Sequence, residues 1–437
     1  MTANTAHCAV DFGTSNSAVA LAGGGRVRLV PLEGGLHTMP TAVFYLAEGP
    51  AESDEPDRLY GRAAVAAYVD GLDGRLMRSM KSLLGSTLLG QRTEVGGGRS
   101  VAYQDVVVGY LRHLRARAEA AHGQPVDGAV LGRPVFFVDD DPVRDGRAQA
   151  ALASAAQAAG WRDLHFQYEP IAAAFAFEAT LSREQVVLVA DIGGGTSDFS
   201  LVRVGPDRLA RLERKGDILA NHGVHVAGTD FDRRVSLAAI MPTLGHGARR
   251  PGRAGVPARV LPSSLYFDLA TWHLINTVYA PARLAEWLAM RSWFEQPAQH
   301  RRLMTVLRQR LGHTLAAAAE SAKIEVAGGG RALIDLAPVE AGLNVSLDAA
   351  GAASALRHDQ DRIVDAARET LRQAGLAPAA VQALFFTGGS TGLASLVDGI
   401  ASVFPEAATV RGDRFASVVQ GLGLYAGRVF AGGAQRR

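Results

Sequence analysis

The sequence predicts an α/β fold made of two similar halves that face each other across a cleft. Two stretches, residues 9–21 and residues 186–204, carry this prediction. Each consists of an apolar strand that ends in Asp, a turn that contains Gly and a Thr-Ser pair, and a returning strand. Their aspartates, Asp11 and Asp191, lie 180 residues apart, and a repeat of this length indicates that one α/β unit has been duplicated.

Composition and charge narrow the class of protein. The chain has 437 residues, of which 48% are hydrophobic and 20% are charged, a balance typical of a globular protein. A net charge of +2 argues against a nucleic-acid partner, and no apolar run approaches the roughly 18–20 residues that cross a bilayer. The single cysteine, Cys8, excludes an intramolecular disulfide. Since residues 1–7 also lack the pattern of a signal peptide, we expect a cytoplasmic protein with no membrane partner.

Strand and helix patterns alternate along the rest of the chain. The predicted strands are short apolar runs at 27–30, 41–45, 128–138 (broken by Pro134) and 384–387, with a surface hairpin at 91–100. The predicted helices lie at 63–69, 76–84, 106–121, 147–159, 393–403 and 416–430, with a mostly helical region at 271–323. Pro170 suits the first turn of a further helix, and Gly160 suits the residue after a helix end.

The turn of the second stretch is suited to binding phosphate through a metal ion. Its three consecutive glycines, 193–195, let the backbone approach a ligand and turn its N–H groups toward an anion. The carboxylates of Asp191 and Asp198 would repel a bare phosphate, so a cation has to lie between them. Mg²⁺, which binds largely through water and phosphate oxygens, is the natural candidate. Taken alone, the turn is equally compatible with a plain hairpin, and the repeat at Asp11 favours the phosphate site.

A third polar turn follows an apolar strand near the end of the chain. Residues 388–391 read Gly-Gly-Ser-Thr and open a helix, whose N-terminus favours anions. Three such turns and two aspartates at strand ends resemble the nucleotide site of the actin-like ATPase superfamily. Within it, residues 168–174, 191–198, 228–232 and 320–324 resemble the DnaK-type heat-shock chaperones, in the same order along the chain. The segment 130–134 is most similar to the YegD-like branch of this family.

This resemblance implies a two-lobed actin-like ATPase, with duplicated ribonuclease H-like α/β domains and a nucleotide cleft between them. Lobe I is then expected at 1–183, lobe II with a helical subdomain at 184–410, and a C-terminal helix that returns to lobe I at 411–437. The implied cofactors are ATP or ADP and Mg²⁺.

The resemblance also assigns roles to single residues. Asp11, Asp191 and Asp198 would hold Mg²⁺, mainly through water. Lys81 would neutralise charge near the γ-phosphate, and Glu169 would lie close to the metal and the attacking water. The expected catalytic residues are therefore Lys81, Glu169, Asp191 and Thr196. The expected nucleotide contacts are Asp11, Gly13, Thr14, Ser15, Asn16, Gly193, Gly194, Gly195, Thr196, Gly228, Glu320, Lys323, Gly388, Gly389 and Ser390.

Without the family, two of these assignments have simpler interpretations. Lys81 would be an ordinary lysine on a surface helix. Glu320 and Lys323, three residues apart, would form an ion pair along a helix surface, whereas the resemblance places both at the ribose.

The implied function is that of an ATP-binding and slowly ATP-hydrolysing, Mg²⁺-dependent chaperone-like protein. Because the chain ends soon after residues 427–430, we expect it to lack the peptide-binding domain of DnaK-type chaperones, and the sequence identifies neither client nor co-chaperone. Three alternative functions are compatible with the same nucleotide site between two lobes: a small-molecule kinase of the sugar-kinase type, a filament-forming actin-like protein, and a nucleotide sensor that binds without useful turnover.

Overall fold

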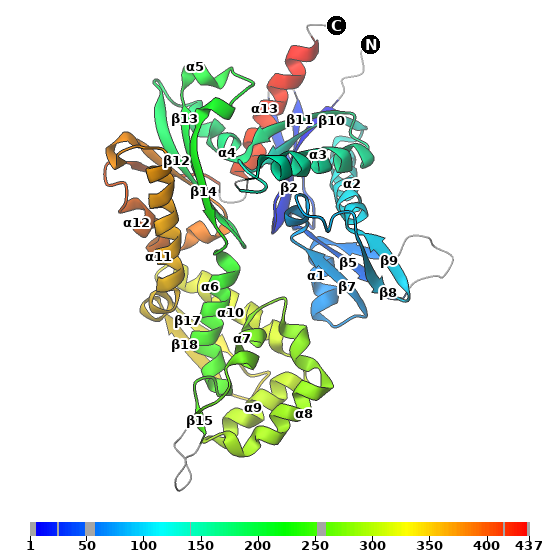
Figure 1. The fold of residues 1–437 in the computed structure, drawn as a ribbon, viewed down its shortest axis with the longest axis vertical. Helices are drawn as coiled ribbons and strands as arrows, with labels where there is room; N and C mark the ends of the chain where they lie inside the picture. Colours follow the sequence, from blue (N-terminus) through cyan, green and yellow to red (C-terminus); the bar gives the residue numbers. More distant parts are fainter. Residues whose placement is uncertain are drawn as a thin grey trace.

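The chain forms two lobes in the computed structural model, which describes residues 6–23, 26–48, 57–139, 141–250, 259–413 and 416–434 (Figure 1). Each lobe contains one large sheet, and both sheets repeat the same strand order. In each, the first strand pairs antiparallel with its hairpin partner and parallel with a strand from much later in the lobe. The predicted α/β fold with duplicated halves is therefore confirmed.

The two sheets correspond strand by strand. The first has the order β11-β10-β1-β2-β3 and consists of β1 (Ala6–Phe12), β2 (Asn16–Gly23), β3 (Arg26–Leu29), β10 (Val126–Arg133) and β11 (Asp163–Tyr168), with β4 (Thr38–Pro40) paired to β2. The second has the order β20-β19-β12-β13-β14 and consists of β12 (Gln185–Ile192), β13 (Ser197–Val204), β14 (Ile218–Val224), β19 (Ala383–Thr387) and β20 (Ala408–Arg411).

Two helices fill the space between the sheets. These are α4 (Glu169–Glu178) and α13 (Ser417–Ala434), and their apolar residues share one core with inward-facing residues of both sheets. Each sheet is thus covered on both faces, which explains why its strands read as continuous apolar runs. The outer face of the first sheet packs against α2 (Tyr103–His122) and α3 (Pro142–Ala158).

A small subdomain extends from each lobe (Figure 1). The one on lobe I consists of β5 (Ala42–Leu46), β6 (Arg58–Tyr60), α1 (Gly61–Val69), β7 (Gly74–Arg78), β8 (Arg92–Gly96) and β9 (Arg99–Ala102). The one on lobe II contains α6 (Gly228–Val235), α7 (Ser264–Ala270), α8 (Pro281–Ala289), α9 (Pro297–Arg308), α10 (Gly312–Ala327), β17 (Arg331–Asp335) and β18 (Asn344–Asp348).

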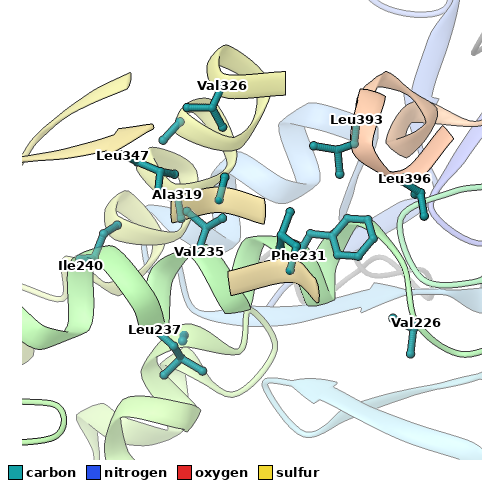
Figure 2. Packing of buried hydrophobic residues seen from close by; sticks show 14 of the residues in the cluster. Val226, Phe231, Val235, Leu237, Ile240, Ala319, Val326, Leu347, Leu393 and Leu396 are labelled. Atoms are coloured by element: carbon teal, nitrogen blue, oxygen red, sulfur yellow. The ribbon is translucent and has the colours of Figure 1, made fainter. Parts of the chain in front are cut away.

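One apolar core joins the outer face of the second sheet to the helical subdomain. Two further helices, α11 (Ala349–Gln373) and α12 (Ala394–Ala401), complete it. Figure 2 shows part of this core, in which side chains from α6, α10, β18 and α12 pack together, among them Phe231, Val235, Ala319, Val326, Leu347 and Leu396. Beyond α6 the same helical path continues through a π-helical segment, Ser236–Ile240, and a 3₁₀ turn, Met241–Leu244.

The structure corrects one sequence-based boundary and refines another. Residues 76–84 are not one helix: β7 ends at Arg78, Ser79 takes a left-handed φ of 56°, and a 3₁₀ turn, Met80–Leu83, follows. Pairing with β5 supplies the strand with partners that its own sequence does not reveal. The strand predicted at 128–138 with a break at Pro134 spans Val126–Arg133 and does not resume, and it ends there because Pro134 has no N–H to donate to a neighbour. Within the described ranges, no helix is both long and apolar enough to cross a membrane.

Candidate functional site

Two aspartates face each other where the second sheet meets the cleft. Asp191 at the end of β12 and Asp198 at the start of β13 are direct partners across the hairpin. Like charges in this position oppose each other and destabilise the sheet. Burial, then the negative charges of Asp198, Glu169 and Asp11, raise the pKa of Asp191 to about 8. The pKa of Asp198 is also raised, since the surrounding protein reduces its hydration, although a hydrogen bond with Thr196 opposes the rise.

Lobe I contributes two more carboxylates and an ammonium group. Lys81, in the 3₁₀ turn after β7, places its Nζ 2.6 Å from Oε1 of Glu169 at the start of α4. Burial opposes the charge on Lys81, yet Glu169 and Asp11 raise the pKa of its ammonium. Burial and the charge of Glu169 raise the pKa of Asp11 to about 7. Lys81 is therefore not an ordinary surface lysine, since its side chain is only 10% exposed.

Three glycine-containing turns meet beside these charges. A Cβ atom at Gly194 would lie 2.7 Å from the Ser15 hydroxyl oxygen, so the turns of the two lobes approach each other closely. Ser390 Oγ donates to the Gly193 carbonyl oxygen at 2.8 Å, and Gly228 N donates to the same oxygen at 3.2 Å. The structure thus brings together the first, second and third turns that the sequence singled out.

The other predicted nucleotide contacts lie within the same three turns or at their edges. Thr14 lies between β1 and β2 and is half-buried, whereas Asn16 begins β2 and is exposed. Gly195 and Thr196 lie between β12 and β13. Gly388 has a φ of +88°, which favours glycine, and a Cβ there would lie 2.4 Å from the Ile192 carbonyl oxygen. The turn of Gly13 is close-packed as well, and Gly389 is exposed at the start of a 3₁₀ turn.

Lys323 and Glu320 do not form the surface ion pair that their spacing allows. Lys323 Nζ lies 2.6 Å from Oδ1 of Asp232 on α6 and 3.4 Å from the Gly228 carbonyl oxygen, and Lys323 is only 9% exposed. Burial raises the pKa of Asp232 to about 6, although Lys323 opposes the rise. Glu320 is exposed on the next turn of α10. The ion pair between Lys323 and Asp232 therefore connects α10 to α6, the helix that begins beside the second glycine turn.

Sequence reasoning missed several residues that hold the turns. Thr41 Oγ1 donates to the Gly13 carbonyl oxygen at 2.8 Å, and the Thr41 N–H donates to the Ser15 carbonyl oxygen at 2.9 Å. Thr229 supports the second turn in the same way, through two hydrogen bonds of 2.8 Å to the Gly194 carbonyl oxygen. Thr41 lies within an apolar strand pattern and carries no sequence signal, whereas Thr229 and Asp232 belong to a motif already noted.

The donor set fits a hydrated Mg²⁺ ion. Four carboxylates, those of Asp11, Glu169, Asp191 and Asp198, surround one ammonium group, so negative charge is in excess. Among the residues that the structure describes, no group of three or more His, Cys, Asp or Glu side chains could hold a metal ion by itself. Mg²⁺ keeps several waters and takes phosphate oxygens as ligands, so it does not need such a group. A cavity of about 40 Å³, lined by Glu169, Asp191 and Asp198, leaves room for water.

A duplicated α/β arrangement with acidic residues and glycine turns between its lobes is the two-lobed fold of the actin-like ATPases. Residues 8–240, more than half of the chain, match the model of the Hsp70 protein family, and the chain belongs to that family. The resemblance to DnaK-type chaperones is thereby confirmed, while the assignment to the YegD-like branch stays a prediction.

Two relatives are chaperones by name. A chaperone protein dnaK of Gracilaria tenuistipitata var. liui is 28% identical over 245 residues, and a chaperone protein HscA homolog of Laribacter hongkongensis is 31% identical over 234 residues. Each match covers 52% of this chain and 36% of the relative, so the chain spans about a third of the length of these curated relatives.

The raised pKa values predict how stability depends on pH. The pKa of Asp11 is about 7 and that of Asp191 about 8 in the folded protein, both above the ordinary value of 3.8. Protonation at these sites therefore stabilises the fold fully below about pH 4, and this contribution is lost as pH rises through 7 and 8. We expect the thermal midpoint of the ligand-free protein to fall between pH 6 and pH 9, and Asp191→Asn to flatten this slope. Identical slopes in wild type and variant would contradict the assignment.

Proposed function

We propose that this chain binds ATP or ADP with Mg²⁺ between its lobes and hydrolyses ATP slowly. The observation that carries the proposal is the group of four carboxylates around Lys81, enclosed by three glycine turns from both lobes. Carboxylates held close together repel one another, so an added cation would offset their charge, and N–H groups in glycine turns suit the phosphates that such a cation accompanies. Mg²⁺, when bound, offsets phosphate charge and orients phosphate oxygens.

The chain's own residues position the reactants. Water attacks the γ-phosphorus, the bond to the ADP oxygen breaks, and ADP, phosphate and a proton leave. Lys81, held by Glu169 at 2.6 Å, presents a positive charge to the γ-phosphate side of the cleft and orients the water. Asp191 and Asp198 would hold the metal through its bound waters, and the N–H groups of residues 193–196 would support the β- and γ-phosphates. Little covalent work remains for the protein, since catalysis rests on positioning and charge.

Residues from the helical subdomain complete the nucleotide site in this proposal. Lys323 reaches the start of α6 and Glu320 is exposed beside it on α10, and both would contact the ribose. Gly388, Gly389 and Ser390 would border the base. Because both named relatives are chaperones, we also propose that the change between ATP and ADP states is read by a polypeptide client or a co-chaperone.

Calorimetric titration followed by turnover on the same sample tests the proposal. Wild-type protein should bind ATP and ADP in Mg²⁺, and chelation of Mg²⁺ should weaken binding. Asp191→Asn should lower turnover by roughly 100-fold, because it removes charge that holds the metal-bound water. Asp207→Asn, on an exposed turn beyond the opposite end of β13 from Asp198, is the matched control and should behave as wild type. Binding without turnover would leave a nucleotide sensor, and no binding at all would refute the proposal.

A further inference from the structure

A cluster of aromatic side chains joins the two small subdomains across the cleft. Tyr68 of α1 lies with its ring centroid 5.1 Å from that of Trp272 and 5.2 Å from that of His313 on α10. The rings of Trp272 and His313 are 4.9 Å apart, and the Arg78 guanidinium lies 4.4 Å above the Trp272 ring. Two members come from lobe I and two from lobe II. We call these four residues the aromatic clasp.

The clasp shares its structural elements with the proposed nucleotide site. Arg78 ends β7, and Lys81 follows in the next turn of the chain. His313 lies in the first turn of α10, and the same helix carries Lys323 about 15 Å further along. Arg78 also interacts electrostatically with Glu320. Opening of the clasp would therefore move the two elements that enclose the cleft from opposite sides.

We propose that the aromatic clasp holds the lobes closed over bound nucleotide, so that its opening sets the rate of nucleotide release and is favoured by acid. The release part rests on the proposed function, whereas the contact between the lobes does not. Tilted and edge-on ring contacts, together with a cation above an indole, hold such a contact without any covalent or metal link.

His313 makes the clasp sensitive to pH. Both of its ring nitrogens are buried without a hydrogen-bond partner, so the closed clasp leaves a polar group unsatisfied that water would reach on opening. Burial, and then the charge of Arg78, lowers the pKa of His313 to about 4. The other groups packed against it do not titrate between pH 5 and 8: Arg78 stays charged, Trp272 has no ionisable group, and burial raises the pKa of Tyr68 above its ordinary value of 10.

The sign of the pH effect follows from these values. In an open clasp the hydrated imidazole would return toward its ordinary pKa of 6.5, whereas the closed clasp keeps the ring neutral down to about pH 4. Protons therefore bind the open form preferentially below pH 6.5. The ratio of open to closed protein should rise about tenfold between pH 7.5 and pH 5.5.

The distance between the subdomains can be measured without any nucleotide. Leu72→Cys and Leu288→Cys place spin labels on exposed positions of the two subdomains, each with 47% of its surface exposed. Cys8 is fully buried and burial raises its pKa to about 12, so it should not take up label. Electron–electron double resonance on this pair should show a longer distance for Trp272→Ala, and a shift toward the longer distance at pH 5.5. His313→Phe should keep the short distance at both pH values.

The outcomes separate the parts of the proposal. An unchanged distance in Trp272→Ala would overturn the clasp, and a pH response that persists in His313→Phe would overturn the role of the histidine. In stopped-flow release of a fluorescent ADP analogue, Trp272→Ala should release at least tenfold faster than wild type. Phe267→Ala, which removes an exposed ring of α7 outside the clasp, should not. Equal release from a demonstrably opened variant overturns the release claim. Failure of every variant to bind the analogue instead refutes the proposed function, and the distances still decide on the clasp.

Discussion

Replacement of Lys81 by alanine is expected to lower ATP turnover by about 10²–10³-fold while ATP still binds. The Lys81 ammonium lies 2.6 Å from Glu169, and its pKa is raised by Glu169 and Asp11 against the effect of burial. It is therefore charged at every physiological pH. In the proposed site its positive charge offsets the negative charge on the γ-phosphate during hydrolysis. The phosphates would keep their contacts with the glycine turns, so binding should weaken much less than turnover.

The composition of the chain provides a matched control for this variant. Lys81, Lys215 and Lys323 are the lysines of the chain, among 45 Lys and Arg residues. Lys215 is exposed on a 3₁₀ turn, and Lys215→Ala should leave steady-state turnover unchanged. Calorimetry on the same samples separates binding from chemistry. A Lys81→Ala protein with wild-type turnover would remove Lys81 from the proposed mechanism.

The second large effect concerns stability. Replacement of Arg214 by methionine is expected to lower the free energy of unfolding by about 3–5 kcal/mol. The Arg214 side chain has no exposed surface, and its two terminal nitrogens donate to both carboxylate oxygens of Glu178 at 2.8 and 3.0 Å. It also pairs with Asp217, whose side chain is 4% exposed. The variant would leave both carboxylates buried without this partner.

Urea denaturation followed by circular dichroism measures this loss. Adding Glu178→Leu to Arg214→Met should recover part of it, because the buried charge is then removed together with its partner. Arg372→Met is the control, since Arg372 pairs with Glu369 on the surface of α11 and is largely exposed, so its loss should leave the denaturation midpoint unchanged. A midpoint for Arg214→Met equal to that of wild type would show that the buried pair contributes nothing net.

The duplicated fold could be predicted because its signal is local and repeated. Each unit shows an apolar strand, an Asp, a glycine turn and a returning strand, and covered sheets make both strands readable as apolar runs. The turns at Asp11 and Asp191 could also be assigned to one site, since the first strands of duplicated sheets end at equivalent places. Their detailed roles stay predictions.

What could not be predicted depends on partners that are distant in sequence. Lys81 has an unremarkable local pattern, so only the family resemblance singled it out, and its contact with Glu169 depends on the fold. Arg214 lies in a charged stretch typical of a solvated loop, yet α4 buries it completely. Tyr68 and Trp272 meet across the cleft although about half of the chain separates them. In each case the deciding energy is burial against another element, which no local pattern records.

The path that begins with α6 has a mechanical consequence. It starts at the second glycine turn, where Gly228 and Thr229 donate to the carbonyl oxygens of Gly193 and Gly194, and it continues to residue 244 inside the helical subdomain. At about 1.5 Å per residue this rod is about 25 Å long, so a tilt of about 5° at the glycine turn displaces its far end by about 2 Å. The wider π-helical turn at Ser236–Ile240 is the point at which such a rod bends most easily. A small rotation on the phosphate side of the cleft is therefore amplified into a larger displacement inside the helical subdomain.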